Sequence, residues 1–289
     1  MVNEYGRSVN ECGENISAEL RYRENSIKRK KRIVIKVGTT TITYPETGNI
    51  NLGKLEKFVR ALINLRNQGK EVIVVSSGAV GVGRTALSMS HKPSTEAEKQ
   101  ACAAVGQSRL MMIYQKLFNE YSQLTGQILL TKEAIFNEEC SNNARRTFEA
   151  LLGMGVVPIV NENDAISVDE LAYGNFGDND TLAAYVTKLV EADLLILLSD
   201  IDGFYTDDPK INLEAKLIHT VSKISDDLEC MAKGATTEMG TGGMWTKIQA
   251  GKIVTENNAD MIIANGENIR IIDDIMEGKE IGTLFTANL

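Results

Sequence analysis

The chain is poor in cysteine, histidine and proline for its 289 residues. Its four cysteines are scattered and include no CxxC pair, which is typical of free thiols in a reducing compartment. The only histidines, His91 and His219, argue against a histidine-based zinc site and against a Ser/His/Asp triad. With four prolines in the whole chain, long irregular linkers are not expected.

Long apolar runs and an excess of basic charge are also missing. No apolar stretch reaches the ~18 residues that a membrane span requires, and the polar N-terminus has no signal-peptide core. The formal net charge of −8 argues against a general affinity for nucleic acid, although it leaves room for a local phosphate site. We therefore expect a cytoplasmic globular protein with neither a membrane nor a nucleic acid as partner.

Three common nucleotide-binding signatures are absent. The chain contains neither a GxxxxGK[ST] loop nor the protein-kinase motif set. Residues 78–83 have the spacing GxxGxG, which differs from the dinucleotide fingerprint, and no acidic residue closes a following strand at the required place. P-loop enzymes, protein kinases and Rossmann dehydrogenases are therefore disfavoured.

A charged residue interrupts the first apolar segment. Four of the five residues from Ile33 to Val37 are aliphatic, which predicts a buried strand, and the exception is Lys36. Burying an unpaired ammonium costs several kcal/mol, so Lys36 should lie near the strand's end and meet an anion. Gly38 and three threonines follow, and a tight turn of this kind can hold phosphate through its backbone N–H groups.

Strand and helix patterns alternate along most of the chain. Apolar residues at i, i+3, i+4 and i+7 predict helices over residues 53–69, 138–152 and 269–278, and a long one over 96–124 that is broken near Gly106. Short apolar runs between them predict strands, and strand–helix–strand order implies parallel pairing. We therefore predict an α/β fold: a three-layer α/β/α sandwich with a mostly parallel central sheet of seven or eight strands.

Polar turns follow many of these strands, where open α/β sheets bind ligands. An early set covers residues 36–41, 77–84, 161–164 and 177–180, and a late set covers 199–208 and 241–247. In the late set, two glycines open a helix whose N–H groups and dipole favour phosphate, and Lys247 lies in its first turn. In the early set, Asp178 is expected to cap the next helix. Capping does not explain the presence of Asp180.

These residue types suit phosphoryl transfer, which depends mainly on positioning and charge neutralisation. Lys36 and Lys247 are our candidates for contact with the transferred phosphoryl group. Asp180 is placed to hold both lysines, which would also explain how Lys36 tolerates burial.

Six short motifs, taken together and in order, resemble the amino acid kinase family from about Arg32 to the C-terminus. They are residues 33–38, 77–79, 104–107 (AVGQ), 161–165 (NENDA), 177–180 (GDND) and 241–247 (TGGMWTK). Within the family, the likeness is to the members that phosphorylate L-glutamate. Residues 31–289 would then form one kinase domain, with the glutamate site in its early half and the ATP site in its late half. Residues 1–30 would form a flexible extension, and no C-terminal RNA-binding-like domain is expected.

The resemblance implies ATP-dependent phosphorylation of the γ-carboxylate of L-glutamate to glutamyl 5-phosphate, the first step of proline biosynthesis. It also implies Mg²⁺, whose ligands stay unassigned, feedback inhibition by proline, and a homodimer or homotetramer. By position, Lys36, Lys247 and Asp180 would be catalytic. Glutamate would be held by Ser77, Asp164 and Asn179, with Asn161 nearby. The nucleotide would be held by Lys36, Ser199, Asp200, Thr241, Gly242, Gly243, Met244, Trp245, Thr246 and Lys247.

Two alternatives stay open. The first is acetylglutamate kinase or another family member; the free α-ammonium of glutamate favours a carboxylate such as Asp164, from which an acetylated substrate gains nothing. The second is a catalytically silent amino-acid sensor on the same fold. Such a sensor is expected to lose a phosphoryl-contacting lysine or its aspartate, whereas Lys36, Lys247 and Asp180 are all present.

Overall fold

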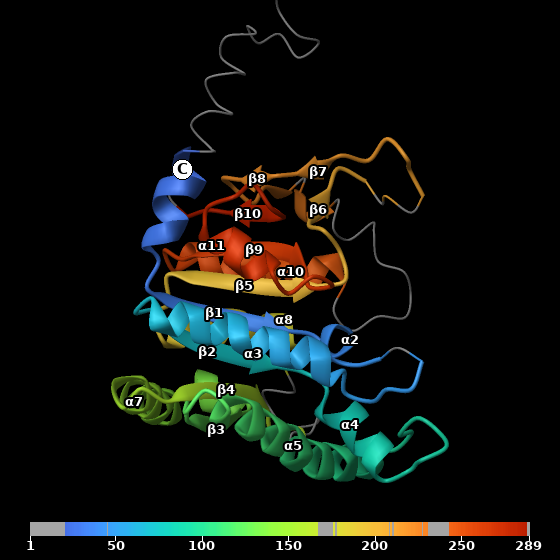
Figure 1. Ribbon diagram of the computed structural model, residues 1–289. Helices are drawn as coiled ribbons and strands as arrows, with labels where there is room; N and C mark the ends of the chain where they lie inside the picture. The colour runs from blue at the N-terminus through green and yellow to red at the C-terminus, as the bar shows by residue number, and fades with distance from the viewer. Residues whose placement is uncertain are drawn as a thin grey trace, which may run out of the picture.

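The computed structural model describes residues 21–44, 46–166, 176, 178–207, 209, 211–226, 228–230 and 243–287. An eight-stranded sheet runs through the molecule in the order β3-β4-β2-β1-β5-β9-β10-β8 (Figure 1). Its strands are β1 (Arg32–Val37), β2 (Glu71–Ser76), β3 (Thr125–Leu130), β4 (Val157–Glu162), β5 (Leu194–Ser199), β8 (Thr220–Val221), β9 (Asp260–Asn265) and β10 (Thr283–Phe285). Neighbours pair in parallel except β9 with β10, which confirms the mostly parallel sheet.

Helices cover both faces of this sheet. They are α2 (Thr39–Ile42), α3 (Leu52–Asn67), α4 (Ala79–Ala86), α5 (Glu96–Asn119), α6 (Lys132–Phe136), α7 (Glu138–Gly153), α8 (Asn179–Leu189), α10 (Met244–Glu256) and α11 (Ile271–Met276). A small separate hairpin pairs β6 (Phe204–Tyr205) with β7 (Leu217–Ile218). In the described ranges, no helix is both long enough and apolar enough to cross a membrane.

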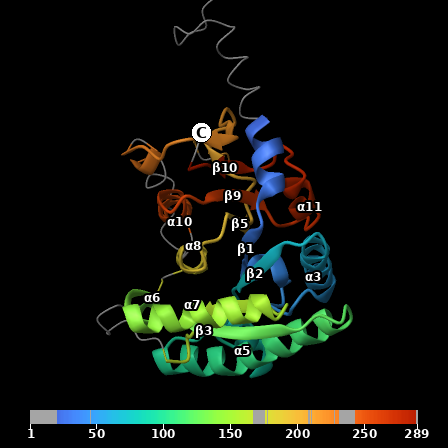
Figure 2. The same cartoon turned by 90° about the vertical axis from the view of Figure 1, so that its left-hand side faces the viewer.

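Two apolar cores lie on opposite faces of the sheet, as the three-layer prediction requires. Successive side chains of a strand point to opposite faces, and β1 follows this rule. Ile33, Ile35 and Val37 belong to the core that contains α3, α5 and α11. Val34 belongs to the core that contains α7, α8 and α10. Figure 2 shows α8 and α10 on one side of the central strands and α3 and α11 on the other.

The same alternation determines on which face of the sheet the charged side chain of β1 lies. Lys36 is two residues beyond Val34, so its side chain leaves the sheet on the face that α8 and α10 cover. Lys36 is also the last residue but one of the strand. The predicted position of Lys36 near the strand's end is therefore confirmed, and its side chain lies close to the N-terminal turns of two helices.

The segment after β2 differs from the open glycine loop that its sequence suggests. Gly78 makes a turn with φ of 102°, a region that L side chains rarely adopt, and helix α4 begins at the next residue. The break expected in α5 near Gly106 is also absent, and α5 ends at Asn119 rather than at residue 124. The physical reason is close packing: a Cβ at Gly106 would lie 1.8 Å from the Ala79 carbonyl oxygen. A Cβ at Gly83 would lie equally close, at 1.8 Å, to the Cys102 carbonyl oxygen.

The expected N-terminal extension is shorter than residues 1–30. Residues 21–26 are helical, and a 3₁₀ turn, η1 (Ile27–Arg29), leads into β1. Arg23 is 1% exposed and donates to the carbonyl oxygens of Ile281, at 2.8 Å, and His219. Tyr22 and Lys30 both bind the buried carboxylate of Asp260, at 3.0 Å and 2.8 Å. The prediction of a flexible segment is therefore wrong from residue 21 onward, because polar anchors and the buried side chain of Ile27 fasten the segment to the rest of the fold.

The contact between α4 and α5 can be tested with Gly106→Ala. The added methyl group would overlap the α4 backbone, so we expect the free energy of unfolding to fall by at least about 1–3 kcal/mol, the usual cost of overpacking. Urea denaturation followed by circular dichroism measures this change. The matched control is Gly153→Ala at the end of α7, where a Cβ meets nothing within 4 Å and stability should hold or rise slightly. Equal stability of the two variants would contradict the packing described here.

Candidate active site

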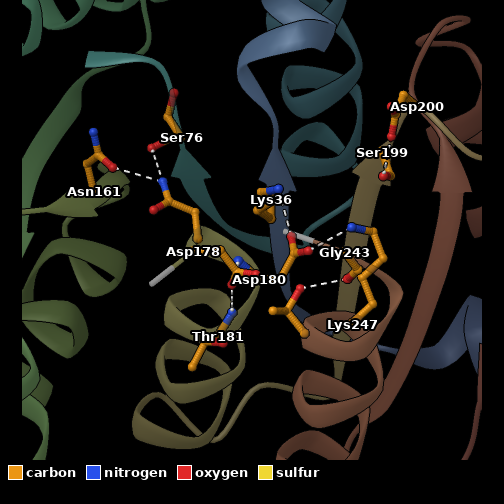
Figure 3. A network of polar contacts seen from close by, with 12 residues as sticks. Lys36, Ser76, Asn161, Asp178, Asp180, Thr181, Ser199, Asp200, Gly243 and Lys247 are labelled. Carbon is orange, nitrogen blue, oxygen red and sulfur yellow. Dashed lines mark hydrogen bonds and ion pairs between the residues drawn. The ribbon is translucent and has the colours of Figure 1, made fainter. Parts of the chain in front are cut away.

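A carboxylate held between two lysines forms the centre of the site. Lys36 comes from β1, Asp180 from the first turn of α8, and Lys247 from the first turn of α10 (Figure 3). The Lys36 Nζ lies 2.7 Å from Asp180 Oδ1, and the Lys247 Nζ lies 3.0 Å from Asp180 Oδ2. Both predicted pairings of Asp180 are present, and they join residues that are 144 and 67 positions away in sequence.

The electrostatics of this trio follow from its burial. Asp180 is 1% exposed, and burial alone would raise the pKa of its carboxyl group. The charges of Lys36 and Lys247, together with the hydrogen bonds that they donate, outweigh that effect and hold the pKa below its ordinary value. The pairing therefore stabilises the fold at neutral pH, and this contribution is lost only as the pH falls through the lowered pKa.

The start of α10 provides a second element for an anion. Gly243 precedes the helix, and no described side chain caps its first N–H groups. Thr246 donates its hydroxyl back to the Gly243 carbonyl oxygen at 2.8 Å, which fixes the turn from which Lys247 projects. Backbone N–H groups and the positive end of the helix dipole make the start of a helix suitable for phosphate. Two predicted nucleotide ligands, Thr241 and Gly242, lie outside the described residues, whereas Met244 and Trp245 lie in the same first turn as Lys247.

The remaining predicted nucleotide residues lie at the end of β5, the strand beside β1. Leu197 is the register partner of Lys36, so Ser199 and Asp200 come just beyond the level of the lysine in the next strand. The Ser199 hydroxyl donates to Asp200 Oδ1 at 3.1 Å, and the Asp200 side chain is exposed. Figure 3 shows both at the end of their strand, on the α10 side of the trio.

On the other side of β1, a cavity of about 450 Å³ lies beside β4 and α5. It is lined by α5 residues, by the ends of β3 and β4, and by residues 162–165, among them Asp164. Burial raises the pKa of Asp164 to about 6, and the nearby charges of Glu162 and Glu96 add to the effect. No basic side chain in the described ranges forms an ion pair with Asp164. The predicted substrate residue is thus a partly buried carboxylate that no described basic side chain pairs with, and it faces a space large enough for an amino acid.

Asparagine side chains connect this cavity to the central trio. The Asn179 Nδ2 donates to the Ser76 carbonyl oxygen at 3.0 Å and to Asn161 Oδ1 at 2.9 Å. Asn161 Oδ1 also accepts the backbone N–H of Glu162 at 2.9 Å, so its oxygen is fully used within the protein. Asn161 therefore acts here by positioning its neighbours. The next residue after Ser76, Ser77, donates its backbone N–H to the Val37 carbonyl oxygen at 3.2 Å, which ties the turn after β2 to the end of β1.

Sequence reasoning gave no role to two polar residues of this region. Gln107 is 7% exposed on α5 and accepts a hydrogen bond from Asn161 Nδ2 at 2.9 Å. Glu162 is also buried, at the end of β4, and accepts the backbone N–H of Phe176 at 3.1 Å. A glutamine on the buried face of α5 and a glutamate ending an apolar strand are signals that could have drawn attention to both.

Replacement of Asp180 by asparagine tests the trio. The neutral amide would leave two buried ammonium groups facing each other, so the free energy of unfolding should fall by about 3–5 kcal/mol. Urea denaturation at neutral pH measures the loss. The control is Asp274→Asn, which removes one of the two carboxylate partners of Lys279 in an exposed ion pair and should cost little stability. If the two variants lose similar stability, the trio is not the strong interaction that its burial indicates.

Comparison with known proteins agrees with this geometry. The model of the amino acid kinase family matches residues 31–265. A glutamate 5-kinase from Clostridium perfringens is 53% identical over 91% of the chain and 97% of its own length. One from Enterococcus faecalis is 50% identical over 90% of the chain and 96% of its own length.

Solved structures share the fold at much lower identity. Carbamate kinase from Giardia lamblia bound to AMP-PNP has a TM-score of 0.63 at 14% identity, covering 90% of this chain and 99% of that one. The product complex of isopentenyl phosphate kinase from T. acidophilum has a TM-score of 0.60 at 16% identity, covering 88% and 100%. These likenesses concern the fold alone. Because the family model covers residues 31–265 and relatives that are about half identical align with about nine tenths of the sequence, the chain belongs to the amino acid kinase family.

Proposed function

We propose that the chain catalyses the glutamate 5-kinase reaction, transferring the γ-phosphoryl group of ATP to the γ-carboxylate of L-glutamate. The product is glutamyl 5-phosphate, the first intermediate of proline biosynthesis. One observation carries the proposal: Asp180 holds Lys36 and Lys247 between an amino-acid-sized cavity and a helix N-terminus suited to phosphate. Curated relatives with about half of their residues identical to this chain bear the same name.

The chemistry needs charge neutralisation more than it needs a base. The γ-carboxylate of glutamate is already ionised at neutral pH, so no proton has to be removed from the nucleophile. Negative charge on the transferred phosphoryl group must be stabilised while attacking and leaving oxygens are held in line. Lys36 and Lys247 supply two ammonium groups for this purpose, and Asp180 keeps them oriented without being available as a base.

Mg²⁺ would accompany the nucleotide. Among the described residues, no three His, Cys, Asp or Glu side chains converge as a metal site. This fits a cation that usually keeps several waters and binds through substrate phosphates with one or two carboxylates. Asp200 is exposed at the end of β5, beside the trio of Lys36, Asp180 and Lys247, and we assign this role to its carboxylate. The ion would neutralise phosphate charge when bound.

The choice of glutamate over its acetylated form is assigned to Asp164. The α-ammonium of glutamate can form a charged hydrogen bond with this carboxylate, whereas an acetamide carries no charge to offer. The residues of the amino-acid side precede Asp180 in the sequence, and those of the nucleotide side, apart from Lys36, follow it. We therefore assign an early glutamate half and a late ATP half to the domain.

Further properties are proposed on the family resemblance. Proline, an amino acid small enough for the cavity of Asp164, is proposed as a feedback inhibitor. A homodimer or homotetramer is supported by exposed apolar side chains on α5, Val105 at 40% and Met112 at 61% exposure. A cytoplasmic location is supported by free cysteines, since Cys102, Cys140 and Cys230 are unpaired.

ADP release tests the proposal directly. The purified chain is incubated with ATP, Mg²⁺ and one acid at a time: L-glutamate, N-acetyl-L-glutamate, L-aspartate or carbamate. We expect release with L-glutamate alone. Release with N-acetylglutamate but not glutamate would overturn the assignment of Asp164, and no release with any acid would favour a silent sensor on the same fold.

The pH dependence of glutamate use provides a separate prediction. Below its raised pKa of about 6, Asp164 is protonated and cannot pair with the α-ammonium; above it, the carboxylate is charged. The value of kcat/KM for glutamate should therefore rise between about pH 5 and 7 and then level off. In Asp164→Asn, this rise should disappear and the KM for glutamate should increase about tenfold or more, the usual cost of a lost charged hydrogen bond.

The KM for ATP is the internal control for these pH measurements, because Asp164 lies on the amino-acid side of the trio. It should stay unchanged in Asp164→Asn at every pH. A variant that keeps its affinity for glutamate but loses affinity for ATP would show that Asp164 has been placed in the wrong half of the site.

A further inference from the structure

A buried hydrogen-bond donor in the cavity has no acceptor in the part of the chain that the structure describes. The side chain of Gln107 is 7% exposed, and its Nε2 has no hydrogen-bond partner among the described residues. Buried polar groups are nearly always paired, so an unpaired one calls for an explanation. Gln107 lines the same cavity as Asp164. A bound ligand that brings an oxygen atom into this cavity would supply the missing acceptor.

The amide orientation of Gln107 is fixed by a chain of hydrogen bonds that starts from two backbone groups. The Ser76 carbonyl oxygen can only accept, so the group of Asn179 that faces it is the Nδ2. The Glu162 backbone N–H can only donate, so the atom of Asn161 that faces it is the Oδ1. The Nδ2 of Asn161 is thereby left to donate to Gln107.

It follows that the oxygen of Gln107 faces Asn161, at 2.9 Å, and its NH₂ group faces away. An amide flip would place two NH₂ groups against each other, so the network admits one orientation. We call this series of side chains, Asn179, Asn161 and Gln107, the amide relay. Its last member presents a donor whose direction is determined by the backbone of β2 and β4.

The position of the relay indicates which part of the substrate is involved. Along the sheet, β1 with Lys36 is followed by β2 and then by β4, with neighbouring strands about 4.8 Å apart. A γ-carboxylate at Lys36 therefore places the α-carbon of glutamate toward β4, where Asp164 and Gln107 lie. The α-carbon carries one cation and one anion. Asp164 suits the ammonium, which leaves the α-carboxylate as the acceptor for the amide.

We propose that Gln107 is a substrate-binding residue whose Nε2 donates a hydrogen bond to the α-carboxylate of the amino-acid substrate. The inference rests on the proposed function and refines it, because it assigns the recognition of the second carboxylate. Asp164 and Gln107 would then act as a pair that selects α-amino acids among dicarboxylates and amines of the same length. Asn161 and Asn179 are positioning residues, since they hold the amide in its direction.

Gln107→Glu separates this role from a structural one. The glutamate side chain has nearly the same shape and keeps an oxygen that accepts from Asn161, so the relay stays connected. At pH 8 it replaces the donor with a negative oxygen that repels a carboxylate. The matched control is Gln115→Glu, which places the same charge on α5 at the exposed rim of the same cavity. Thermal denaturation verifies that both variants are folded.

The test compares glutamate with two analogues, each lacking one group on the α-carbon. 4-Aminobutanoate lacks the α-carboxylate, and glutarate lacks the α-ammonium. The quantity measured is kcat/KM from ADP release, or the inhibition constant against glutamate for an analogue that is not phosphorylated. Gln107→Glu should lower kcat/KM at least tenfold for glutamate and glutarate but less than about threefold for 4-aminobutanoate. Asp164→Asn should have the opposite selectivity: it should lower kcat/KM for 4-aminobutanoate and leave kcat/KM for glutarate nearly unchanged.

The outcomes separate this inference from the proposed function. If the unmodified chain releases no ADP with glutamate, the proposed function itself fails. If it does release ADP, equal losses for all three compounds in Gln107→Glu would show a purely structural role and overturn the inference. Unchanged kinetics, or the same loss in Gln115→Glu, would overturn it as well.

Discussion

Two positive charges in the middle of the fold can lie close together only because a third, negative charge lies between them. Lys36, Asp180 and Lys247 belong to a strand and to two helices that are far apart in sequence, and all three are largely buried. Without the carboxylate, the ammonium groups would repel each other and would draw water into the sheet. The first turns of α8 and α10 thus have one relative position that satisfies the charges, and it leaves both ammonium groups near the turn that opens α10.

Much of this arrangement could be predicted from the sequence because a charged residue within an apolar segment needs a partner of opposite charge. A lysine in an aliphatic strand has to find an anion, and Asp180 was available once Asp178 had been assigned to the helix cap. The cap is confirmed: Asp178 Oδ1 accepts from the backbone N–H groups of Asp180 and Thr181. Alternation along β1 then decides the face on which the charges meet. The mostly parallel pairing and the three-layer architecture follow from the βαβ pattern in the same way.

Other features could not be predicted because single contacts across the fold determine them. Glycine lowers helix propensity, so Gly81 and Gly83 suggested a loop, yet close packing against α5 makes a small residue necessary inside α4. Gln107 lies in a motif to which the sequence alone assigns no role. Its unpaired NH₂ group can be recognised only when the orientation of the Asn161 side chain is known. No local pattern distinguishes Arg23 in a polar segment from an ordinary exposed arginine, although its guanidinium is buried.

The attachment of Arg23 has a consequence for one edge of the sheet. Its guanidinium binds carbonyl oxygens of residues 219, 281 and 282. Residues 219 and 282 directly precede β8 and β10, the two strands that pair at this edge. One buried side chain therefore holds together the helical segment before β1 and both strands of the edge.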